Sequence, residues 1–552
     1  MVKKRLSLLR NLFFPLIFVI TAQWIDLRLD LTQDQRYTLN SSTIESLVNI
    51  EKPLRIDVFL SGKLPAEYLR LLREIKALFK NMQTHTDKIS IEYIDPFEGA
   101  SNSAVLIDEM NKFGISPEYV RSENIQAIEQ RVVFPWAIVN DGNKTLRIPL
   151  ITYNLGDSHQ EKMNRSVAQI EFKFFDAFIK INRKQKKALA LLTSHATSED
   201  AKIADLLKSL QPYYQLASFD LKALENDPIK TLDNLKRFEL LVVSNPKNSF
   251  SKQEKYLLDQ HLMNGGKQLW MINPIAVNRD SLFNQQGSTV ASGNELNIAN
   301  AFFKYGFRLE KNLVKDLYCA PIVLATGVHN QAQYLPIPWP YYPLAQATNH
   351  IIGKGISNVL FKFPSVIDTL KSTAKKTVLV GTSDFSKKIQ TPISISLKEA
   401  SEKLLPSYFN QPSQILGVLL SGTLSSAFEN RIKPFELHNN IEKGESEMII
   451  FSEGTLAENQ LDKGQPLELG YDKWTNNFYG NKAFLKNSIH YLMNDHKLLY
   501  IRNKEISLPI FDLESVAQRG NSWRIILFSL PLILLSGIGA IILRFRKAKY
   551  SQ

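Results

Sequence analysis

A run of nineteen uncharged residues near the end of the chain constrains its fold more than any other feature. Residues 525–543 read IILFSLPLILLSGIGAIIL, and four Lys or Arg residues follow within the next six positions. At about 1.5 Å per residue, a helix of this length spans roughly the 30 Å hydrocarbon layer of a bilayer. We therefore predict a transmembrane helix over residues 524–543. Residues 544–552 would form a basic cytoplasmic tail, because Lys and Arg beside a span resist translocation.

The start of the chain contains a second apolar run. Residues 12–25 read LFFPLIFVITAQWI, and four of the first ten residues are Lys or Arg. The run is short for a span, so two interpretations compete: a cleaved secretory signal, or an uncleaved anchor within residues 1–25. We favour the anchor, because the bulky sequence QWID follows Ala22, where a signal peptidase requires small residues. Both termini would then be cytoplasmic, with about five hundred residues across the membrane between them.

The charge and the cysteine content exclude two classes of protein. The formal net charge of +13 would suit nucleic-acid binding, but residues 1–10 and 544–552 carry eight Lys or Arg and no acidic residue. That leaves 59 basic against 54 acidic residues elsewhere, which is a mixed, solvated surface. We therefore expect membrane lipid as a partner and no nucleic acid. The single cysteine, Cys319, excludes an internal disulfide framework, which a large bacterial periplasmic domain does not need.

The first third of the chain predicts a stalk and a small α/β domain. Residues 26–53 would form a juxtamembrane stalk that ends in a short helix capped by Ser41 or Ser42. Over residues 54–182 the pattern is β-α-β-α-β-β-α, the order of a thioredoxin-like domain. Its strands are expected at 54–60, at 89–95 and, as a hairpin around Asp141-Gly142, within 131–150.

This domain would lack the chemistry of a thioredoxin. A redox-active thioredoxin needs a Cys pair at the start of the first helix, where the thiol pKa is lowered. The corresponding stretch, residues 61–65, reads SGKLP. We therefore predict that the fold is present without the CxxC motif.

Residues 183–496 predict a larger domain. Apolar strands at 188–194, 238–246 and 267–273 alternate with single helices, one capped by Ser198 and one opened by the capping box Ser251–Glu254. This alternation implies right-handed crossovers and a doubly wound parallel sheet of the Rossmann or amidotransferase-like kind. Residues 497–523 would be a linker that returns to the membrane.

Four polar residues follow the strands of this predicted sheet and form the candidate ligand site. In doubly wound sheets, ligands bind beyond the carboxyl ends of the strands, which here are marked by Thr193, His195, Asn245 and Asn273. No nucleophile or carboxylate can be assigned beside His195, and Cys319 is expected to pack as a small hydrophobe. The histidines lack zinc-site spacing, and the Gly265-Gly266 pair ends a helix instead of opening one. We therefore predict no catalytic residue, no metal site and no cofactor.

A proline-rich aromatic segment is the other candidate surface. Residues 334–344 read YLPIPWPYYPL, with Trp339, Tyr341 and Tyr342 among four prolines. The segment is either a loop packed on the sheet or a docking surface for a partner, because aromatic residues are common in both settings.

The chain resembles the gliding-motility-associated ABC transporter auxiliary proteins of Bacteroidetes, the GldG family, along nearly its whole length. The matching stretches are RLDLTQDQRYTLN (28–40), KQEKYLLDQHLMNGGKQLWMIN (252–273), NIANAFFKYGFRLEKNLVKDLYC (297–319), IPWPYYPL (337–344), GYDKWTNNFYGNKAFLKNSIHYLMND (470–495) and NSWRIILFSLPLILL (521–535). The resemblance implies a non-catalytic subunit that works with a cytoplasmic ATPase and a membrane permease. Family members often carry a Gly-His-Gly-Glu-like turn after the first strand of the central domain, whereas residues 193–197 here read TSHAT.

Three functional hypotheses follow. The first is a periplasm-facing auxiliary subunit of an ABC transporter in the bacterial inner membrane, with a substrate-binding or coupling role. The second is a structural scaffold of the motility or secretion machinery, and the third is an α/β enzyme that acts on envelope material. The absence of a phosphate-binding loop means that any ATP hydrolysis must come from a partner.

Overall fold

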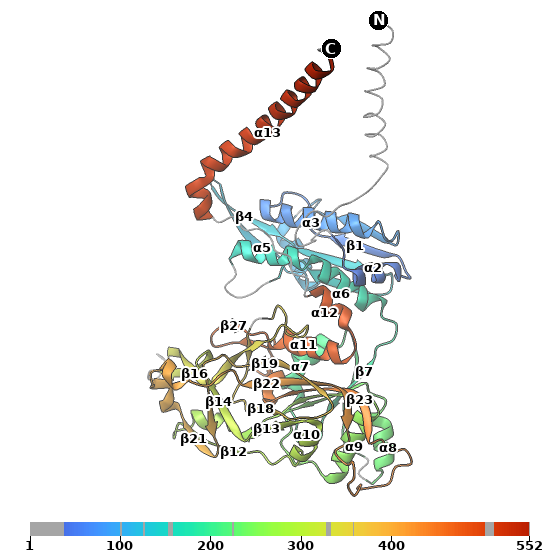
Figure 1. The fold of residues 1–552 in the computed structure, drawn as a ribbon, viewed down its shortest axis with the longest axis vertical. Helices are drawn as coiled ribbons and strands as arrows, with labels where there is room; N and C mark the ends of the chain where they lie inside the picture. Colours follow the sequence, from blue (N-terminus) through green and yellow to red (C-terminus); the bar gives the residue numbers. More distant parts are fainter. Residues whose placement is uncertain are drawn as a thin grey trace. The chain divides into compact units, whose positions relative to one another are not determined.

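The structure, a computed structural model, is a mixed α/β protein (Figure 1). It describes residues 38–99, 102–124, 127–152, 158–223, 226–326, 333–356, 358–502 and 513–550. Within these residues one compact unit extends to Arg502, and a second unit contains the C-terminal helix. The predicted N-terminal anchor, residues 1–25, lies outside the described residues.

The first sheet has four strands in the order β2-β1-β5-β6. The strand β1 (Leu54–Val58) pairs in parallel with β2 (Ile89–Tyr93) and antiparallel with β5 (Trp136–Asn140), which pairs with β6 (Thr145–Pro149). The predicted hairpin at Asp141-Gly142 is confirmed. A hairpin of β3 (Glu118–Asn124) and β4 (Ala127–Val133) precedes β5 and was not expected.

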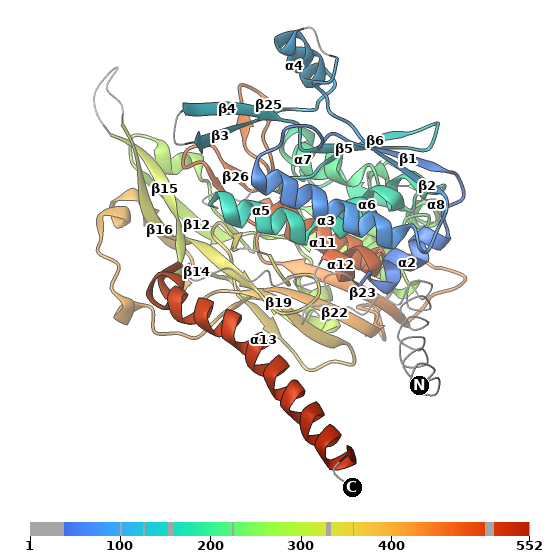
Figure 2. The ribbon, with the colours of Figure 1, turned by 90° about the horizontal axis from the view of Figure 1, so that it is seen from above.

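Five helices accompany this sheet. They are α2 (Ser41–Val48), α3 (Ala66–Met82), α4 (Ser103–Lys112), α5 (His159–Ala168) and α6 (Ile170–Asn182). The apolar face of α3 is buried, and α3 packs against α5 (Figure 2). The predicted Ser cap of α2 is wrong by one residue, because Asn40 accepts the capping hydrogen bond from the Ser42 backbone N–H at 2.9 Å.

The second sheet has ten strands, and half of it is the predicted parallel sheet. Its parallel strands are β8 (Gln215–Phe219), β7 (Ala188–Leu192), β9 (Leu240–Ser244), β10 (Lys267–Met271) and β23 (Lys443–Phe451), in that order across the sheet. The order reverses direction between β7 and β9. Such a reversal is a topological switch point, where ligands bind beyond the carboxyl ends of the strands.

The other half of this sheet is antiparallel, which corrects the prediction of an entirely parallel sheet. The sheet continues from β23 through β22 (Ile415–Ser425), β19 (Lys375–Gly381), β16 (Gln333–Ala347) and β15 (Cys319–Thr326), and β17 (Val359–Leu360) pairs with β16. No described α-helix lies between β15 and β23. Because parallel neighbours need a long crossover and antiparallel neighbours do not, this connectivity favours antiparallel pairing.

Helices cover both faces of the parallel half. The helices are α7 (Asp200–Leu210), α8 (Pro228–Leu235), α9 (Lys252–Met263), α10 (Ala299–Tyr305), α11 (Asn481–Leu492) and α12 (His496–Arg502). The helices α7, α11 and α12 share one apolar core with the sheet, and α8, α9 and α10 share the other. The capping box Ser251–Glu254 is confirmed, but Glu199 and not Ser198 occupies the N-cap position of α7.

Short strands and turns of 3₁₀ helix complete this body around a third apolar core. The strands are β11 (Ile275–Ala276), β12 (Ser288–Gly293), β13 (Phe307–Leu309), β14 (Asn312–Asp316), β18 (Ile367–Thr369), β20 (Ser386–Gln390), β21 (Ile393–Ser396), β24 (Leu461–Asp462), β25 (Gln465–Pro466), β26 (Tyr471–Asp472) and β27 (Asn477–Phe478). The 3₁₀ helices are η1 (Asp280–Phe283), η3 (Leu397–Ser401), η4 (Pro406–Tyr408) and η5 (Gly454–Ala457). The third core contains Trp339 and Tyr341, so the predicted aromatic segment lies in the strand β16, whose residues 339–343 are buried while Tyr334 and Leu335 are exposed.

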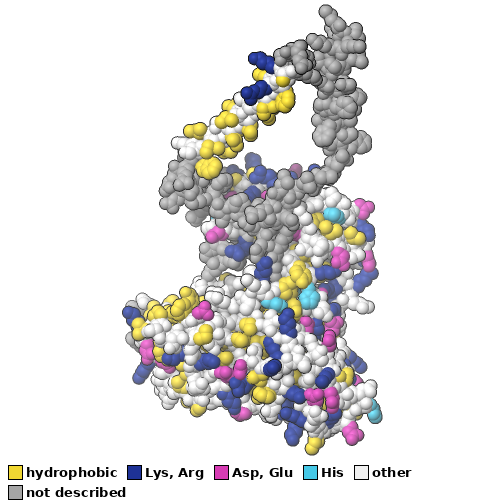
Figure 3. Space-filling view, in the orientation of Figure 1, with side chains coloured by type: hydrophobic (Ala, Val, Ile, Leu, Met, Phe, Trp, Pro, Cys, Tyr) yellow, Lys and Arg dark blue, Asp and Glu magenta, His cyan; other side chains and the backbone are white. Residues whose placement is uncertain are grey.

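The second unit contains the helix α13 (Leu513–Tyr550), which holds the predicted C-terminal span. Within it, residues Gly520–Ala548 are long and apolar enough to cross a membrane, with none of the most apolar window buried. Apolar side chains cover this helix, and Lys and Arg gather near its end (Figure 3). A helix that is apolar on all sides and buried on none is typical of a membrane span.

Candidate functional site

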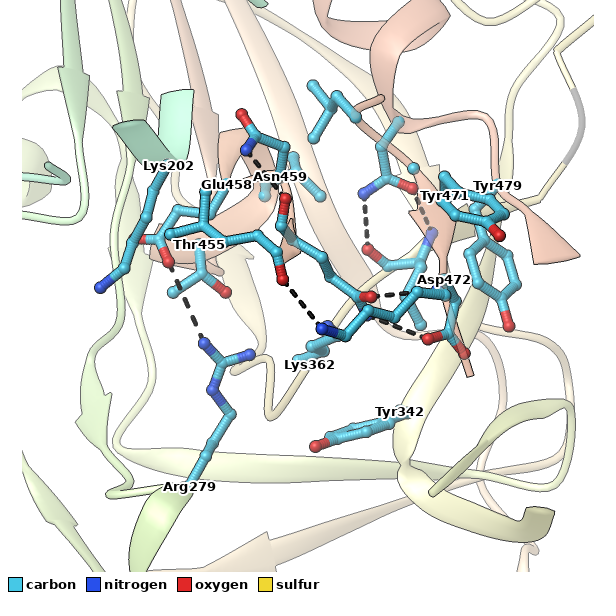
Figure 4. A pocket seen from close by; sticks show the side chains of 18 of the residues that line it. Lys202, Arg279, Tyr342, Lys362, Thr455, Glu458, Asn459, Tyr471, Asp472 and Tyr479 are labelled. Atoms are coloured by element: carbon cyan, nitrogen blue, oxygen red, sulfur yellow. Dashed lines mark hydrogen bonds and ion pairs between the residues drawn. The ribbon is translucent and has the colours of Figure 1, made fainter. Parts of the chain in front are cut away.

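A polar cavity of about 410 Å³ lies beyond the carboxyl ends of β10 and β23 (Figure 4). Four segments supply its walls: the turn that carries Arg279 after β11, the region of Tyr342 and Lys362 around β16 and β17, residues 453–461 after β23, and the β26–β27 hairpin. The wall that carries Arg279 comes fewer than ten residues after Met271, where β10 ends, and the wall formed by residues 453–461 begins two residues after Phe451, where β23 ends. The parallel edge of the sheet therefore positions two of the four walls. This is the edge at which the sequence predicted a ligand site.

Charged side chains of both signs line the cavity. The basic ones are Lys202, Arg279, Lys362 and Lys473, and the acidic ones are Asp280, Glu453, Glu458 and Asp472. Their formal charges therefore cancel. Tyr342, Tyr471, Tyr479 and Trp474 add aromatic surface to the same walls. We refer to this site as the polar cavity.

The ammonium of Lys362 has no hydrogen bond and no ion pair with any residue that the structure describes. Its Nζ lies 5.8 Å from the centre of the Tyr342 ring, which is a long cation–π contact. Burial, with a smaller contribution from the nearby Arg279, lowers the pKa of Lys362. The cavity therefore contains a cation whose donors are unused.

The two glutamates of the cavity each keep part of their hydrogen-bonding capacity. Glu453 accepts hydrogen bonds from the backbone N–H and the hydroxyl of Thr455 on the same oxygen, Oε1. Burial raises the pKa of Glu453, although Arg279 and Lys362 oppose that rise. Glu458 Oε2 lies 4.0 Å from the Arg279 guanidinium, and Figure 4 shows that contact.

The asparagines predicted at the strand ends hold Glu458 in place. Asn245 Nδ2 donates to Glu458 Oε1 at 3.0 Å, and Ser198 Oγ donates to the same oxygen at 2.8 Å. Asn273 donates to Asn245 Oδ1 at 3.1 Å and accepts from the Gly454 backbone N–H at 2.8 Å. These residues therefore lie behind the cavity wall and do not line it. Thr193, the first predicted residue, hydrogen-bonds the Phe219 backbone carbonyl at the β7–β8 edge, away from this wall.

His195 is buried beside two polar groups that the sequence did not reveal. Its Nε2 lies 3.2 Å from Glu254 Oε1, its Nδ1 lies 2.9 Å from Ser194 Oγ, and its ring stacks on Phe250 at 4.0 Å. The expectation that no carboxylate lies beside His195 is therefore wrong. The ring is 2% exposed and none of these residues lines the polar cavity, so the arrangement ties the β7 end to the capping box of α9.

Of the predicted aromatic residues, only Tyr342 lines the polar cavity. Trp339 and Tyr341 are 0% and 1% exposed, so their rings are not available to a docking partner. The other cavity residues were missed because they are far apart in the sequence and follow no motif. Glu453 was the one with a usable signal, since it comes two residues after the buried strand that ends at Phe451.

A second polar cluster joins α6 to the end of the large domain. Arg183 makes two hydrogen bonds to Asp495, at 2.9 and 3.1 Å, and Tyr214 donates to the same carboxylate at 2.6 Å. The Tyr214 hydroxyl also lies 2.7 Å from His490 Nδ1. We refer to Arg183, Tyr214, His490 and Asp495 as the hinge network, because Arg183 directly follows α6, where the first of the two predicted domains ends and the second begins.

No group of three or more His, Cys, Asp or Glu residues that could hold a metal ion occurs among the described residues. Cys319, at the start of β15, is partly buried, and burial raises its thiol pKa to about 12. A thiol with a raised pKa is a poor nucleophile at neutral pH. The described site is therefore suited to binding a polar molecule.

The fold and the site together define a mixed α/β protein with a polar cavity at a sheet edge and a C-terminal helix of membrane-spanning length. A family model described as an ABC-type uncharacterized transport system matches residues 186–488, more than half of the chain. The chain belongs to this family and is a transport-associated auxiliary component. A second model, a domain of unknown function, matches residues 33–140.

Comparisons with individual proteins add little to this assignment. No curated protein matches the sequence. Among solved structures, the one titled "mmIFT52 N-terminal domain" aligns at 12% identity over 56% of this chain and 97% of its own, with a TM-score of 0.33. That score is too low to support an argument about fold or function.

Proposed function

We propose that this protein is a non-catalytic, periplasm-facing auxiliary subunit of an ABC transporter associated with gliding motility, of the GldG type. The observation that carries the proposal is the coincidence of two features in one chain. The region matched by the transport-system family contains the polar cavity, and a helix able to span a membrane follows that region. A binding or coupling domain tethered to the membrane suits a transporter subunit better than it suits a freely diffusing binding protein.

The proposed topology has two anchors, within residues 1–25 and 524–543, and places both termini in the cytoplasm. The basic residues after Leu543 favour a cytoplasmic C-terminus by the positive-inside rule. Between the anchors we propose a stalk over 26–53, a thioredoxin-like domain over 54–182 and a doubly wound domain over 183–496. The four-stranded order β2-β1-β5-β6 and the five parallel strands support these two assignments.

The partners would be a cytoplasmic ATPase and a membrane permease. No stretch of this sequence has the order strand, glycine-rich loop and helix that a phosphate-binding loop requires, so the energy for transport would come from the ATPase. The subunit would communicate with the permease through its membrane helices and the stalk.

The test is a mild-detergent purification of the tagged full-length protein from its native membranes, followed by mass spectrometry. We expect an ABC ATPase and a permease to co-purify, and the N-terminal peptide of the chain to remain attached. An unrelated single-span membrane protein with the same tag is the control. Recovery of envelope or motility components without either transporter subunit would instead favour a scaffold, and ATP hydrolysis by the purified chain alone would contradict the non-catalytic assignment.

A further inference from the structure

The polar cavity has the size and the lining of a site for a small polar molecule. Its volume of about 410 Å³ falls within the range of roughly 300 to 1,000 Å³ that is usual for ligand pockets. Its charged groups form no closed network. Lys362 has no hydrogen-bond or ion-pair partner among the described residues, and the only ionic contact of Arg279 is with Glu458, at 4.0 Å.

The Lys362 side chain is partly buried and its ammonium faces the cavity, with the carboxylates of Glu453, Asp472 and Glu458 near it but no direct acceptor among the described residues. The aromatic face of Tyr342, at 5.8 Å, compensates weakly for that absence. An anionic group bound in the cavity would supply the missing acceptor. Arg279, which shares the cavity with Lys362, would add a second, forked donor for the same group.

The cavity also contains negative charge, because the carboxylates of Glu453 and Glu458 can accept further hydrogen bonds. Within the described residues, Thr455 donates both hydrogen bonds of the Glu453 carboxylate to one oxygen, Oε1. Glu458 Oε1 accepts from Ser198 and Asn245, and its Oε2 lies 4.0 Å from Arg279. A purely anionic ligand would lie against these two carboxylates, and a purely cationic ligand would lie against Lys362 and Arg279. A ligand that carries both charges satisfies both pairs.

We propose that the polar cavity binds a small zwitterion of the amino-acid or short-peptide class, with its carboxylate on Lys362 and Arg279 and its ammonium toward Glu453 and Glu458. The aromatic side chains then contact the ligand's own side chain. Trp474 is half exposed and lies 5.0 Å from the Tyr334 ring, so this aromatic pair is at the mouth of the cavity.

This inference deepens the proposed function, because it names the class of molecule that a substrate-binding auxiliary subunit would present to its permease. It rests on the proposed function only for that biological role. Binding itself is a property of the chain alone and can be measured without the transporter. An experiment can therefore contradict either proposal without contradicting the other.

The first experiment is isothermal titration calorimetry of the purified full-length protein in detergent with L-alanyl-L-alanine and with free L-alanine and L-glutamate. Two blocked peptides are the matched probes: N-acetyl-alanyl-alanine lacks the ammonium, and alanyl-alanine amide lacks the carboxylate. We expect at least one zwitterion to bind and each blocked form of the dipeptide to bind at least tenfold more weakly than the dipeptide itself. If no zwitterion binds, or if inorganic phosphate or a blocked peptide binds as tightly, the proposal is overturned.

The second experiment locates the binding. Lys362→Met keeps the length of the side chain and removes its charge, and Glu458→Gln keeps the shape and removes the opposite charge. Both should lower the affinity at least tenfold, whereas Lys222→Met, at an exposed position, should leave it unchanged. Unchanged affinity in both cavity variants, with thermal unfolding showing that they are folded, would exclude this cavity.

The membrane purification described above separates this inference from the proposed function. Lys362→Met should still co-purify with the ATPase and the permease, because the Lys362 ammonium makes no hydrogen bond or ion pair with a described residue that would hold the fold. Loss of binding with partners retained supports both proposals. Absence of the transporter partners from wild type, with zwitterion binding intact, would leave the ligand inference standing and remove the transporter role.

Discussion

The polar cavity and the hinge network both bury ionisable side chains, but they differ in how those side chains are paired. In the hinge network Arg183 donates two hydrogen bonds to the Asp495 carboxylate, and Tyr214 donates a third. The side chains of Arg183 and Asp495 are both 15% exposed. In the polar cavity Lys362 makes no hydrogen bond or ion pair with a described residue, although Glu453, Asp472 and Glu458 lie near it, and Arg279 has a distant partner. A cluster held by direct hydrogen bonds stabilises the fold, whereas charges that make no direct contact in a cavity are available to a ligand. The comparison therefore separates a structural cluster from the proposed binding site.

The largest expected effect is at the hinge network. Asp495→Ala leaves the Arg183 guanidinium and the Tyr214 hydroxyl without their shared acceptor, so we expect the free energy of unfolding to fall by about 3 kcal/mol. Urea denaturation followed by circular dichroism measures it. Asp462→Ala is the matched control, because its ion pair with Lys473 is exposed and should contribute less than about 1 kcal/mol. Equal losses for the two variants would show that the network is not structural.

The cavity should respond in the opposite way. Lys362→Met removes a partly buried charge that makes no hydrogen bond or ion pair with a described residue, and we expect the free energy of unfolding to stay the same or to rise by about 1 kcal/mol. The same denaturation experiment measures it, beside the loss of zwitterion binding. A loss of 3 kcal/mol or more, comparable with Asp495→Ala, would mean that Lys362 supports the fold and would erase the distinction between the two clusters.

The pH dependence of stability should have opposite signs in the two regions. Burial lowers the pKa of His490 well below its ordinary value, helped by Lys486, Arg502, Arg183 and Lys180, so the unfolded state takes up the proton first. The stability that neutral His490 provides is therefore lost as the pH falls below about 6.5. Relative to wild type, His490→Gln should become more stable as the pH is lowered.

Glu453 gives the reverse dependence. Burial and the nearby Glu458 raise its pKa above 4.5, while Thr455, Arg279 and Lys362 act against the rise. The stability of the protonated form is present at low pH and is lost as the pH rises above 4.5. Relative to wild type, Glu453→Gln should therefore become more stable as the pH is raised from 5 to 8. Thermal melts of both variants across this pH range measure how the stability of each variant, relative to wild type, changes with pH. A change of the same sign in both variants would contradict the opposite pH dependences predicted for the two regions.

The smallest effects on stability are expected at two helix N-caps. Ser158 and Ser251 each accept a hydrogen bond from the third backbone N–H of a helix, in reciprocal capping boxes with Glu161 and Glu254. Replacing either serine by Ala should cost about 1 kcal/mol and leave zwitterion binding unchanged. Chemical denaturation and calorimetry test this pair, and a tenfold loss of affinity in Ser251→Ala would connect α9 to the cavity.

The sequence predicted the features that depend on neighbouring residues. A capping box, a glycine at a helix end and an Asp-Gly turn act within a few residues, and the helix α9 and the β5–β6 hairpin are where these signals placed them. The predicted strand from 131 to 140 was divided, however. Pro135 has no backbone N–H for the ladder, so β4 ends at Val133 and β5 begins at Trp136.

Features that depend on residues far apart in the sequence were harder to predict. The 334–344 segment was predicted to be either a loop packed on the sheet or a docking surface, but pairing with β15 makes it a strand, and a neighbouring core buries Trp339 and Tyr341. Ser198 has the composition of a helix cap, yet its hydroxyl hydrogen-bonds Glu458, which is 260 residues away. A local pattern contains no information about such distant partners.

By itself the sequence determined the long apolar helix near the C-terminus, the alternation of strands and helices, and the edge of the sheet that carries the polar cavity. Each of these follows from the periodicity, length or polarity of a continuous stretch. Only the tertiary structure decided that five parallel strands continue into an antiparallel half, and that Arg279, Lys362, Glu453 and Glu458 share one cavity. Those residues meet because separate elements pack against a common core, and the free energy of that packing belongs to the whole fold rather than to any one segment.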